Sequence, residues 1–130
     1  MKNITIIGDN RPGLLADIAD LLANAGINIE SMDAETAGQM GVVSLTASDY
    51  DLAMERLRDA DYQVLSEDAM VLKLEDKPGA LARVAAKFKE KNVDIRSMRL
   101  LKREGDHCLV SLVAEKTPQV MELVKDSLVA

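Results

Sequence analysis

The residues best suited to bind a ligand occur twice, in a charged loop that ends in Pro-Gly. The first copy is Asp9–Gly13 (DNRPG), and the second, 66 residues later, is Glu75–Gly79 (EDKPG). Glycine has no Cβ, so the backbone at Gly13 and Gly79 can approach a ligand closely. An amphipathic segment with helical periodicity follows each loop. Unpaired N–H groups and the helix dipole at such a helix start favour an anionic group such as a carboxylate.

Each loop belongs to a longer repeat, Asp9–Met32 and Glu75–Met98. The identical pairs are Pro12/Pro78, Gly13/Gly79, Leu15/Leu81, Ala16/Ala82, Ala19/Ala85, Ile29/Ile95, Ser31/Ser97 and Met32/Met98. Self-similarity at a fixed spacing indicates repeated modules. The chain of 130 residues therefore predicts two modules, residues 1–67 and residues 68–130. Because a module of this size buries little surface alone, we expect the two to pack on each other, on a second chain, or on both.

The first module predicts the order strand, helix, strand, strand, helix, strand. The predicted strands are Lys2–Ile7, ending at Gly8, then Ile27–Glu35, Met40–Ser48 and Tyr62–Ser66. One predicted helix runs from the Pro-Gly loop to Gly26 with Leu15, Ile18, Ala19 and Leu22 inward; the other is Asp49–Ala60, capped by Ser48 or Asp49.

The second module repeats this order but ends early. Its predicted strands are Met70–Leu74, Val93–Leu101 and Cys108–Ala114, and its helices are Gly79–Lys91, with Leu81, Val84, Ala85 and Phe88 inward, and Pro118–Leu128. One extra residue is expected in the hairpin tip at Glu104-Gly105-Asp106, where a loop absorbs it. We expect the last strand to be missing, which leaves a sheet edge for another chain; the alternative is a vestigial strand at Leu128–Ala130.

The expected fold class is therefore α+β, with two tandem ferredoxin-like βαββαβ modules and antiparallel sheets, the second lacking most of its last strand. The net charge of −6 and pI near 4.8 argue against nucleic-acid or membrane partners. A single Cys excludes an intrachain disulfide, and no apolar run reaches about 20 residues. The expected location is the cytoplasm.

Several functions of this fold are disfavoured by composition. An RNA-recognition motif needs aromatic side chains on its central strands, whereas this chain has one Phe, two Tyr and no Trp. A metal carrier needs cysteines in the first loop, where neither copy has Cys or His. His107 and Cys108 are adjacent strand residues that point to opposite faces, which disfavours a metal site or a nucleophile pair. Neither a cofactor nor enzymatic activity is expected, because no triad or phosphate-binding loop is present.

The repeated pattern resembles the ACT domain, the small regulatory module of enzymes of amino-acid metabolism. It consists of the acidic Pro-Gly loop, about thirteen helical residues, and then Gly-Ile-Asn-Ile at residues 26–29 or Asn-Val-Asp-Ile at residues 92–95. The resemblance covers nearly all of the chain, as two tandem copies. Compared with the family, we expect a truncated second copy and no attached catalytic domain.

The resemblance implies that a free amino acid binds near the strand–helix loops, at an interface between modules whose sheets lie side by side. The predicted ligand-binding residues are Asn10, Arg11, Pro12, Gly13, Leu14, Asn28, Ile29, Asp76, Lys77, Pro78, Gly79, Ala80, Asp94 and Ile95. Asn28 and Asp94 are candidates to accept hydrogen bonds from an α-ammonium group. Alternatively, Asn10 and Asp76 cap helices, and Asn28 and Asp94 satisfy turn backbone.

The loops differ in charge, so we expect unequal binding. The first loop contains Asp9-Asn10-Arg11, and the second contains Glu75-Asp76-Lys77. The additional carboxylate of the second loop disfavours an anionic group there unless Lys77 compensates for its charge. The function predicted is a non-catalytic regulatory or sensor protein for an amino acid, forming a homodimer through sheet or helix packing, with a metabolic enzyme as a further partner. The alternatives are a structural assembly module without a metabolite, and a regulatory subunit of an amino-acid biosynthetic enzyme such as a branched-chain synthase.

Overall fold

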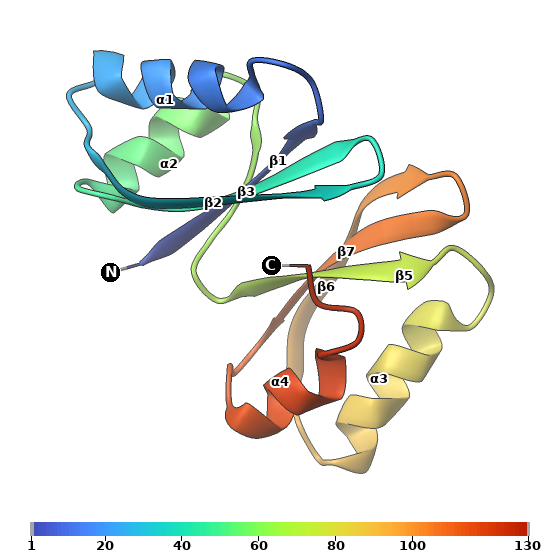
Figure 1. Ribbon diagram of the computed structural model, residues 1–130. Helices are drawn as coiled ribbons and strands as arrows, with labels where there is room; N and C mark the ends of the chain where they lie inside the picture. Colours follow the sequence, from blue (N-terminus) through green and yellow to red (C-terminus); the bar gives the residue numbers. More distant parts are fainter. Residues whose placement is uncertain (1, 130) are drawn as a thin grey trace. The chain divides into compact units, whose positions relative to one another are not determined.

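The computed structural model describes residues 2–129 and divides the chain into two compact units, Met1–Glu67 and Asp68–Ala130. The elements of the first unit are β1 (Asn3–Asp9), α1 (Leu14–Asn24), β2 (Ile29–Ala37), β3 (Met40–Ala47), α2 (Tyr50–Asp59) and β4 (Gln63–Leu65). The strands form one antiparallel sheet in the order β2-β3-β1-β4, and both helices lie on the same face of it (Figure 1). The predicted βαββαβ order is confirmed for this unit.

Local sequence explains where the first unit's helices begin and end. Gly13 begins α1 with a left-handed backbone (φ 88°), and Gly26 follows its C-terminus at φ 74°, as predicted for that glycine. Asp49 caps α2, since its side chain accepts a hydrogen bond from the Leu52 N–H at 3.1 Å. β1 continues through Gly8 to Asp9 rather than ending at Gly8, because Gly8 pairs with Gly41 of β3.

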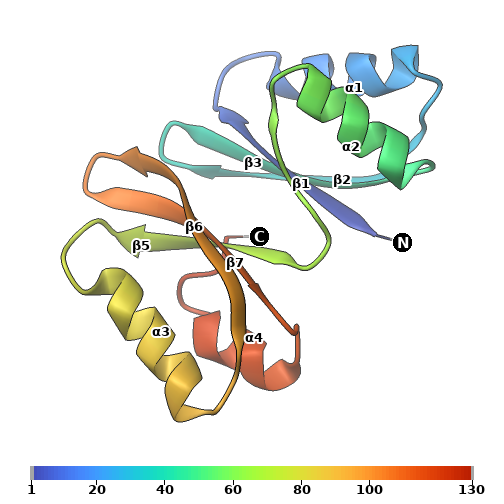
Figure 2. The same cartoon turned by 180° about the vertical axis from the view of Figure 1, so that it is seen from behind.

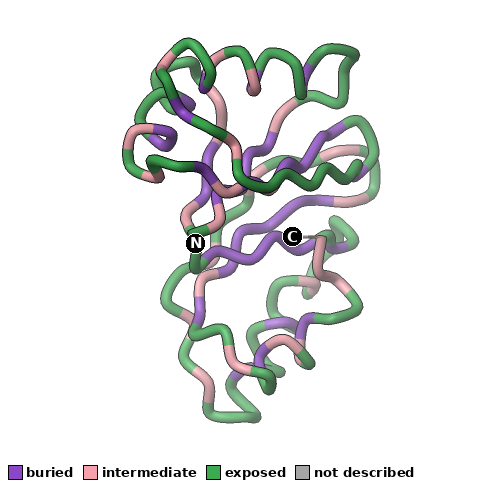
Figure 3. Tube along the Cα trace, turned by 60° about the vertical axis from the view of Figure 1, so that its left-hand side comes forward, coloured by how far each residue is buried: buried purple, intermediate pink, exposed green. Residues whose placement is uncertain are grey.

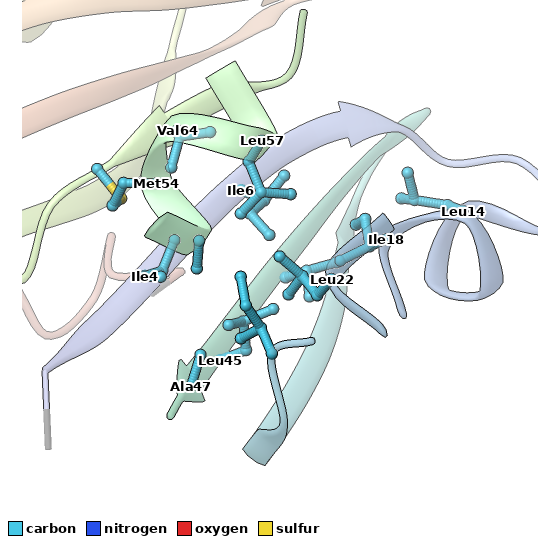
Figure 4. Close-up of a cluster of buried hydrophobic side chains, with 13 residues drawn as sticks. Ile4, Ile6, Leu14, Ile18, Leu22, Leu45, Ala47, Met54, Leu57 and Val64 are labelled. Carbon is cyan, nitrogen blue, oxygen red and sulfur yellow. The ribbon is translucent and has the colours of Figure 1, made fainter. Parts of the chain in front are cut away.

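The core of the first unit lies between the sheet and its two helices (Figure 4). Its fully buried side chains include Ile4, Ile6, Ile18, Leu22, Leu45 and Leu57. The predicted inward face of α1 is correct for Ile18 and Leu22 and wrong for Leu15, which is 41% exposed. Leu14 is buried in its place, so the apolar face begins one residue earlier than the periodicity indicated.

The second unit repeats this arrangement with β5 (Ala69–Glu75), α3 (Ala80–Glu90), β6 (Ile95–Glu104), β7 (His107–Ala114) and α4 (Pro118–Val124). Its strands are antiparallel in the order β5-β7-β6, with α3 and α4 on one face (Figure 2). The buried residues of this unit concentrate on β5 and β7, whereas β6 and α3 are mostly exposed (Figure 3). On α3, Val84 and Phe88 are buried as predicted, but Leu81 and Ala85 are exposed.

The edge of the second sheet at β5 is partly covered, which corrects the expectation of an open edge. α4 ends at Val124, and Leu128 then bridges Leu72. The Lys73 N–H donates to the Ser127 carbonyl, and the Val129 N–H donates to the Val71 carbonyl, both at 2.8 Å. The vestigial strand is therefore present, and the chain covers its own edge over three residues. Ala130 lies outside the described residues.

The extra residue of the second hairpin is a β-bulge and does not lie in the turn. Two residues separate the strands in both hairpins, Gly38-Gln39 in the first unit and Gly105-Asp106 in the second. The register of β6 against β7 shifts between Leu100 and Lys102, so Leu101 is the inserted residue. The predicted turn insertion is wrong because a bulge accommodates one residue inside a strand and changes the direction of the side chains that follow.

None of the helices described in residues 2–129 is long and apolar enough to cross a membrane.

Candidate ligand-binding site

The two strand–helix loops have the same backbone conformation. Gly13 and Gly79 are both left-handed, at φ 88° with ψ −1° and −7°, and neither helix start has a side-chain cap. This conformation costs a residue with a Cβ about 1–2 kcal/mol, so glycine is required for the turn itself. The interpretation of Asn10 and Asp76 as helix caps is wrong, because Gly13 and Gly79 occupy the cap positions.

A hollow of about 430 Å³ lies over the start of α3. It is lined by the predicted residues Asp76, Lys77, Pro78, Gly79 and Ala80, together with Glu75, Leu81, Ala82, Leu100, Arg103 and Cys108. This volume lies within the range of pockets that hold small molecules. Five of the predicted residues, the consecutive stretch 76–80, thus line this hollow, whereas the predicted Asp94 and Ile95 do not.

The backbone at the start of α3 offers hydrogen-bond donors to this hollow. The Ala80 N–H donates to the Lys77 carbonyl at 3.2 Å, and the Arg83 N–H donates to the Gly79 carbonyl at 2.9 Å. Leu81 and Ala82 stand between these two residues in the chain, and their N–H groups have no backbone acceptor among the described residues. Free N–H groups at a helix N-terminus favour an anionic group.

The carboxylates of the second loop are each paired with a cation. Lys77 Nζ lies 2.7 Å from Glu75 Oε2, and Arg103 Nε lies 3.1 Å from Asp76 Oδ2. The hydrogen bond and charge of Lys77 lower the pKa of the exposed Glu75 carboxyl below its ordinary value. Lys77 thus supplies the compensation that the sequence left open, and Arg103 adds a second compensating charge.

The matching space in the first unit is filled by Leu14. A Cβ placed on Gly41 would lie 2.7 Å from Leu14 Cδ2, and one on Gly8 would lie 3.1 Å from Leu14 Cδ1. Gly8 and Gly41 pair with each other across β1 and β3, so Leu14 packs against two backbone segments that carry no side chain. Arg11 is bound to Asp17, with Nη2 and Oδ2 2.6 Å apart.

The second unit distributes its side chains in the opposite way. Leu74 and Cys108 form the strand pair that corresponds to Gly8 and Gly41, and Ala80 stands where the first unit has Leu14. The apolar bulk therefore lies on the strands, and the small residue on the helix leaves the hollow open. Burial raises the pKa of the Cys108 thiol, which keeps it in the neutral form.

Asn28 and Asp94 lie at the far ends of the first helices. Asn28 follows the C-terminus of α1, an 11-residue helix that spans about 16 Å at 1.5 Å per residue. A single amino acid cannot reach from Gly13 to Asn28 within one unit. The Asn28 N–H donates to Ser48 Oγ at 3.0 Å, so its backbone completes a turn; Asp94 is exposed. The neighbouring Ile29 and Ile95 are half-buried and pair with Ala47 and Ala114.

The predicted ligand-binding residues omitted six residues that line the hollow, namely Glu75, Leu81, Ala82, Leu100, Arg103 and Cys108. The strand pairing brings Cys108 beside Leu74, and the bulge at residue 101 precedes Arg103. The replacement of Leu14 by Ala80 between the two repeats was the available signal, because it accompanies the replacement of two glycines by larger residues. No group of three His, Cys, Asp or Glu side chains suited to a metal occurs among residues 2–129.

One family model matches part of the chain. The ACT domain family model matches residues 2–61. Among solved structures, a protein from Bacteroides thetaiotaomicron is 24% identical with a TM-score of 0.50, over 99% of this chain and 91% of that chain. The regulatory subunit of aspartate kinase from Thermus thermophilus is 17% identical with a TM-score of 0.43, over 96% and 91% of the two chains.

The acetolactate synthase small subunit from Thermotoga maritima is 12% identical with a TM-score of 0.43, over 99% of this chain and 89% of that chain. No curated protein sequence matches the chain. At 24% identity and a TM-score of 0.50, the likeness to the Bacteroides thetaiotaomicron protein bears on the fold alone. The match over residues 2–61 confirms, for the first unit, the resemblance to the ACT domain that the Pro-Gly repeat indicated.

Proposed function

We propose that this chain is a non-catalytic regulatory protein that binds a free amino acid at the loop between β5 and α3. The observation that carries the proposal is the hollow of about 430 Å³ over the start of α3. It combines free backbone N–H groups with paired carboxylates and apolar walls. The ACT model matches residues 2–61 of the first unit, and the Pro-Gly loop of the second unit repeats the loop within that match. The resemblance to this family therefore favours an amino acid as the ligand.

Each part of an amino acid has a suitable partner in this hollow. The N–H groups of Leu81 and Ala82 suit the α-carboxylate, since they are donors at a helix N-terminus. The carboxylates of Glu75 and Asp76 suit the α-ammonium group. Leu100 provides an apolar surface for the side chain. This arrangement does not select a particular amino-acid side chain.

The first loop is the weaker site in this proposal. Leu14 occupies the space over Gly8 and Gly41 that a ligand would need. The sequence predicts unequal binding because the additional carboxylate of the second loop repels the carboxylate of an amino acid. The structure supports unequal binding for a different reason, because the two loops differ in free volume.

A filling substitution tests the proposal. A thermal-shift screen against the common amino acids identifies the ligand, because a compound that binds the native state raises the melting temperature. Ala80→Leu places bulk in the hollow, and we expect calorimetry to show binding at least tenfold weaker. Ala86→Leu is the matched control, since Ala86 is exposed on the same helix and does not line the hollow. Equal binding by both variants would contradict the proposed site.

A structural assembly module without a metabolite is the second candidate, and exposed apolar side chains favour it. Leu15, Met32, Leu81 and Leu100 are each exposed by about two-fifths. Such side chains suit a contact with another copy or with an enzyme, including the case of a regulatory subunit. If no amino acid at millimolar concentration raises the melting temperature, and Leu15→Glu changes the mass measured by light scattering, this candidate replaces the first.

A further inference from the structure

A second groove, of about 260 Å³, lies between α3 and the edge of β5. Its polar lining includes Lys73 from β5, Arg83 and Lys87 from α3, and Ser127 from the vestigial strand. Lys73 and Ser127 are held together by the hydrogen bond from the Lys73 N–H to the Ser127 carbonyl at 2.8 Å. Three cationic side chains thus surround one groove in a protein whose net charge is −6.

The groove is lined by three cations and one carboxylate. None of Lys73, Arg83 and Lys87 forms an ion pair with another residue in the described range 2–129. The one acidic residue in the lining is Glu75, whose carboxylate lies 2.7 Å from Lys77 Nζ. The charge of Arg83 also acts on this carboxylate, as a smaller cause of its lowered pKa. Like charges in one groove repel each other unless an anion lies between them. With three cations and one carboxylate in its lining, the groove carries a net positive charge.

The fold does not require these charges. The corresponding positions of the first unit are Ile7 on β1, Asp17 and Leu21 on α1, and Gln63 on β4. The same element arrangement is thus built there without any cation. The net charges of the two units differ in the same direction. Residues 1–67 contain twelve acidic and four basic residues, a net charge of −8, whereas residues 68–130 contain ten acidic and twelve basic residues, a net charge of +2.

We propose that this groove binds a small anion that carries two or more negative charges, such as a phosphate ester or a polycarboxylate. The Arg83 guanidinium is a planar fork suited to two anionic oxygens, and Lys73 and Lys87 add charge from either side. The Ser127 hydroxyl is a further donor. Arg83 also lies close to the loop between β5 and α3, since its Nη1 is 3.4 Å from the position that a Cβ on Gly79 would occupy.

Calorimetry with sodium pyrophosphate and with citrate, at low ionic strength, tests this proposal. Binding of pyrophosphate alone assigns the groove to phosphate esters, and binding of citrate alone assigns it to carboxylates. We expect Lys73→Met and Lys87→Met each to weaken binding about tenfold, because a charge-assisted hydrogen bond contributes roughly that factor. Lys89→Met is the matched control, since Lys89 lies on the same helix outside the lining, and should change the affinity less than about twofold.

Two results would overturn the inference. One is that neither anion binds at millimolar concentration. The other is that Lys89→Met weakens binding as much as Lys87→Met, which would indicate diffuse attraction to a basic helix. Lys73→Met distinguishes anion binding in this groove from amino-acid binding in the larger hollow, because Lys73 lines only the groove. Its thermal shift with the amino acid should equal that of the native protein.

Discussion

The loop between β1 and α1 and the loop between β5 and α3 share a backbone but differ in what fills them. In the first unit, Leu14 packs on Gly8 and Gly41 and closes the space. In the second unit, Ala80 takes the place of the leucine, and the hollow at the helix start stays open. The Pro-Gly turn therefore sets the shape of the loop. The side chains at three neighbouring positions decide whether it has room for a ligand.

The helices that follow the loops differ in charge. Asp17 of α1 binds Arg11 of its own loop at 2.6 Å, which neutralises both groups. The matching residue of α3 is Arg83, which has no ion pair within residues 2–129. The first loop is thus closed and its arginine is paired, whereas the second loop keeps an open hollow beside an arginine that forms no ion pair among residues 2–129. Divergence of this kind between duplicated units is a physical basis for assigning binding to one of them.

The largest effect is expected from opening the first loop. Leu14→Ala should lower the free energy of unfolding by about 3 kcal/mol in urea titrations, because Gly8 and Gly41 have no side chains that could fill the cavity. Leu15→Ala is the control, since Leu15 is exposed, and should cost less than about 1 kcal/mol. Similar losses from both variants would show that Leu14 is not the closing residue.

A smaller loss is expected from adding bulk beneath Leu14. The Cβ of Gly41→Ala would lie 2.7 Å from Leu14 Cδ2, so we expect a destabilisation of about 1–2 kcal/mol. The double variant Gly41→Ala with Leu14→Ala should lose less than the sum of the single variants, because the two side chains compete for the same space. Strict additivity in urea unfolding would contradict this packing.

The helices also differ in how they are capped. Asp49 Oδ1 accepts from the Leu52 N–H at 3.1 Å, and Thr117 Oγ1 accepts from the Val120 N–H at 3.2 Å. Asp49→Ala and Thr117→Ala should each cost about 1 kcal/mol in thermal or urea unfolding. Asn10→Ala should cost less, since α1 begins at Gly13 without a side-chain cap. A loss from Asn10→Ala as large as that from Asp49→Ala would restore the capping role of the loop.

The smallest effect concerns the pH dependence of the second loop. Lys77 holds the pKa of Glu75 below its ordinary value, so the contribution of this pair is present above the ordinary pKa of an unfolded glutamate. It is lost as the pH falls through the lowered pKa of the folded protein. In an NMR titration, Lys77→Met should raise the pKa of Glu75 toward the ordinary value. An unchanged titration would show that Lys77 does not hold the carboxylate.

Periodicity and turn chemistry predicted most of the elements, because both depend on neighbouring residues. The predicted order of strands and helices is correct, and the boundaries differ by at most four residues. Leu15 was misassigned because two apolar residues, Leu14 and Leu15, stand side by side at the helix start, and periodicity alone does not say which one faces the sheet. The bulge at Leu101 was missed because an extra residue costs little in either a turn or a strand.

The Pro-Gly loops, the two-fold repeat and the βαββαβ order follow from the sequence alone. Proline and glycine restrict or permit local dihedral angles, and apolar spacing selects helix or strand, so no distant contact is needed. Which loop is open was decided by tertiary structure. Leu14 meets Gly41, and Ala80 stands near Cys108, only because strands β3 and β7 bring residues nearly thirty positions away against the helix starts. The room for a ligand is a property of that packing.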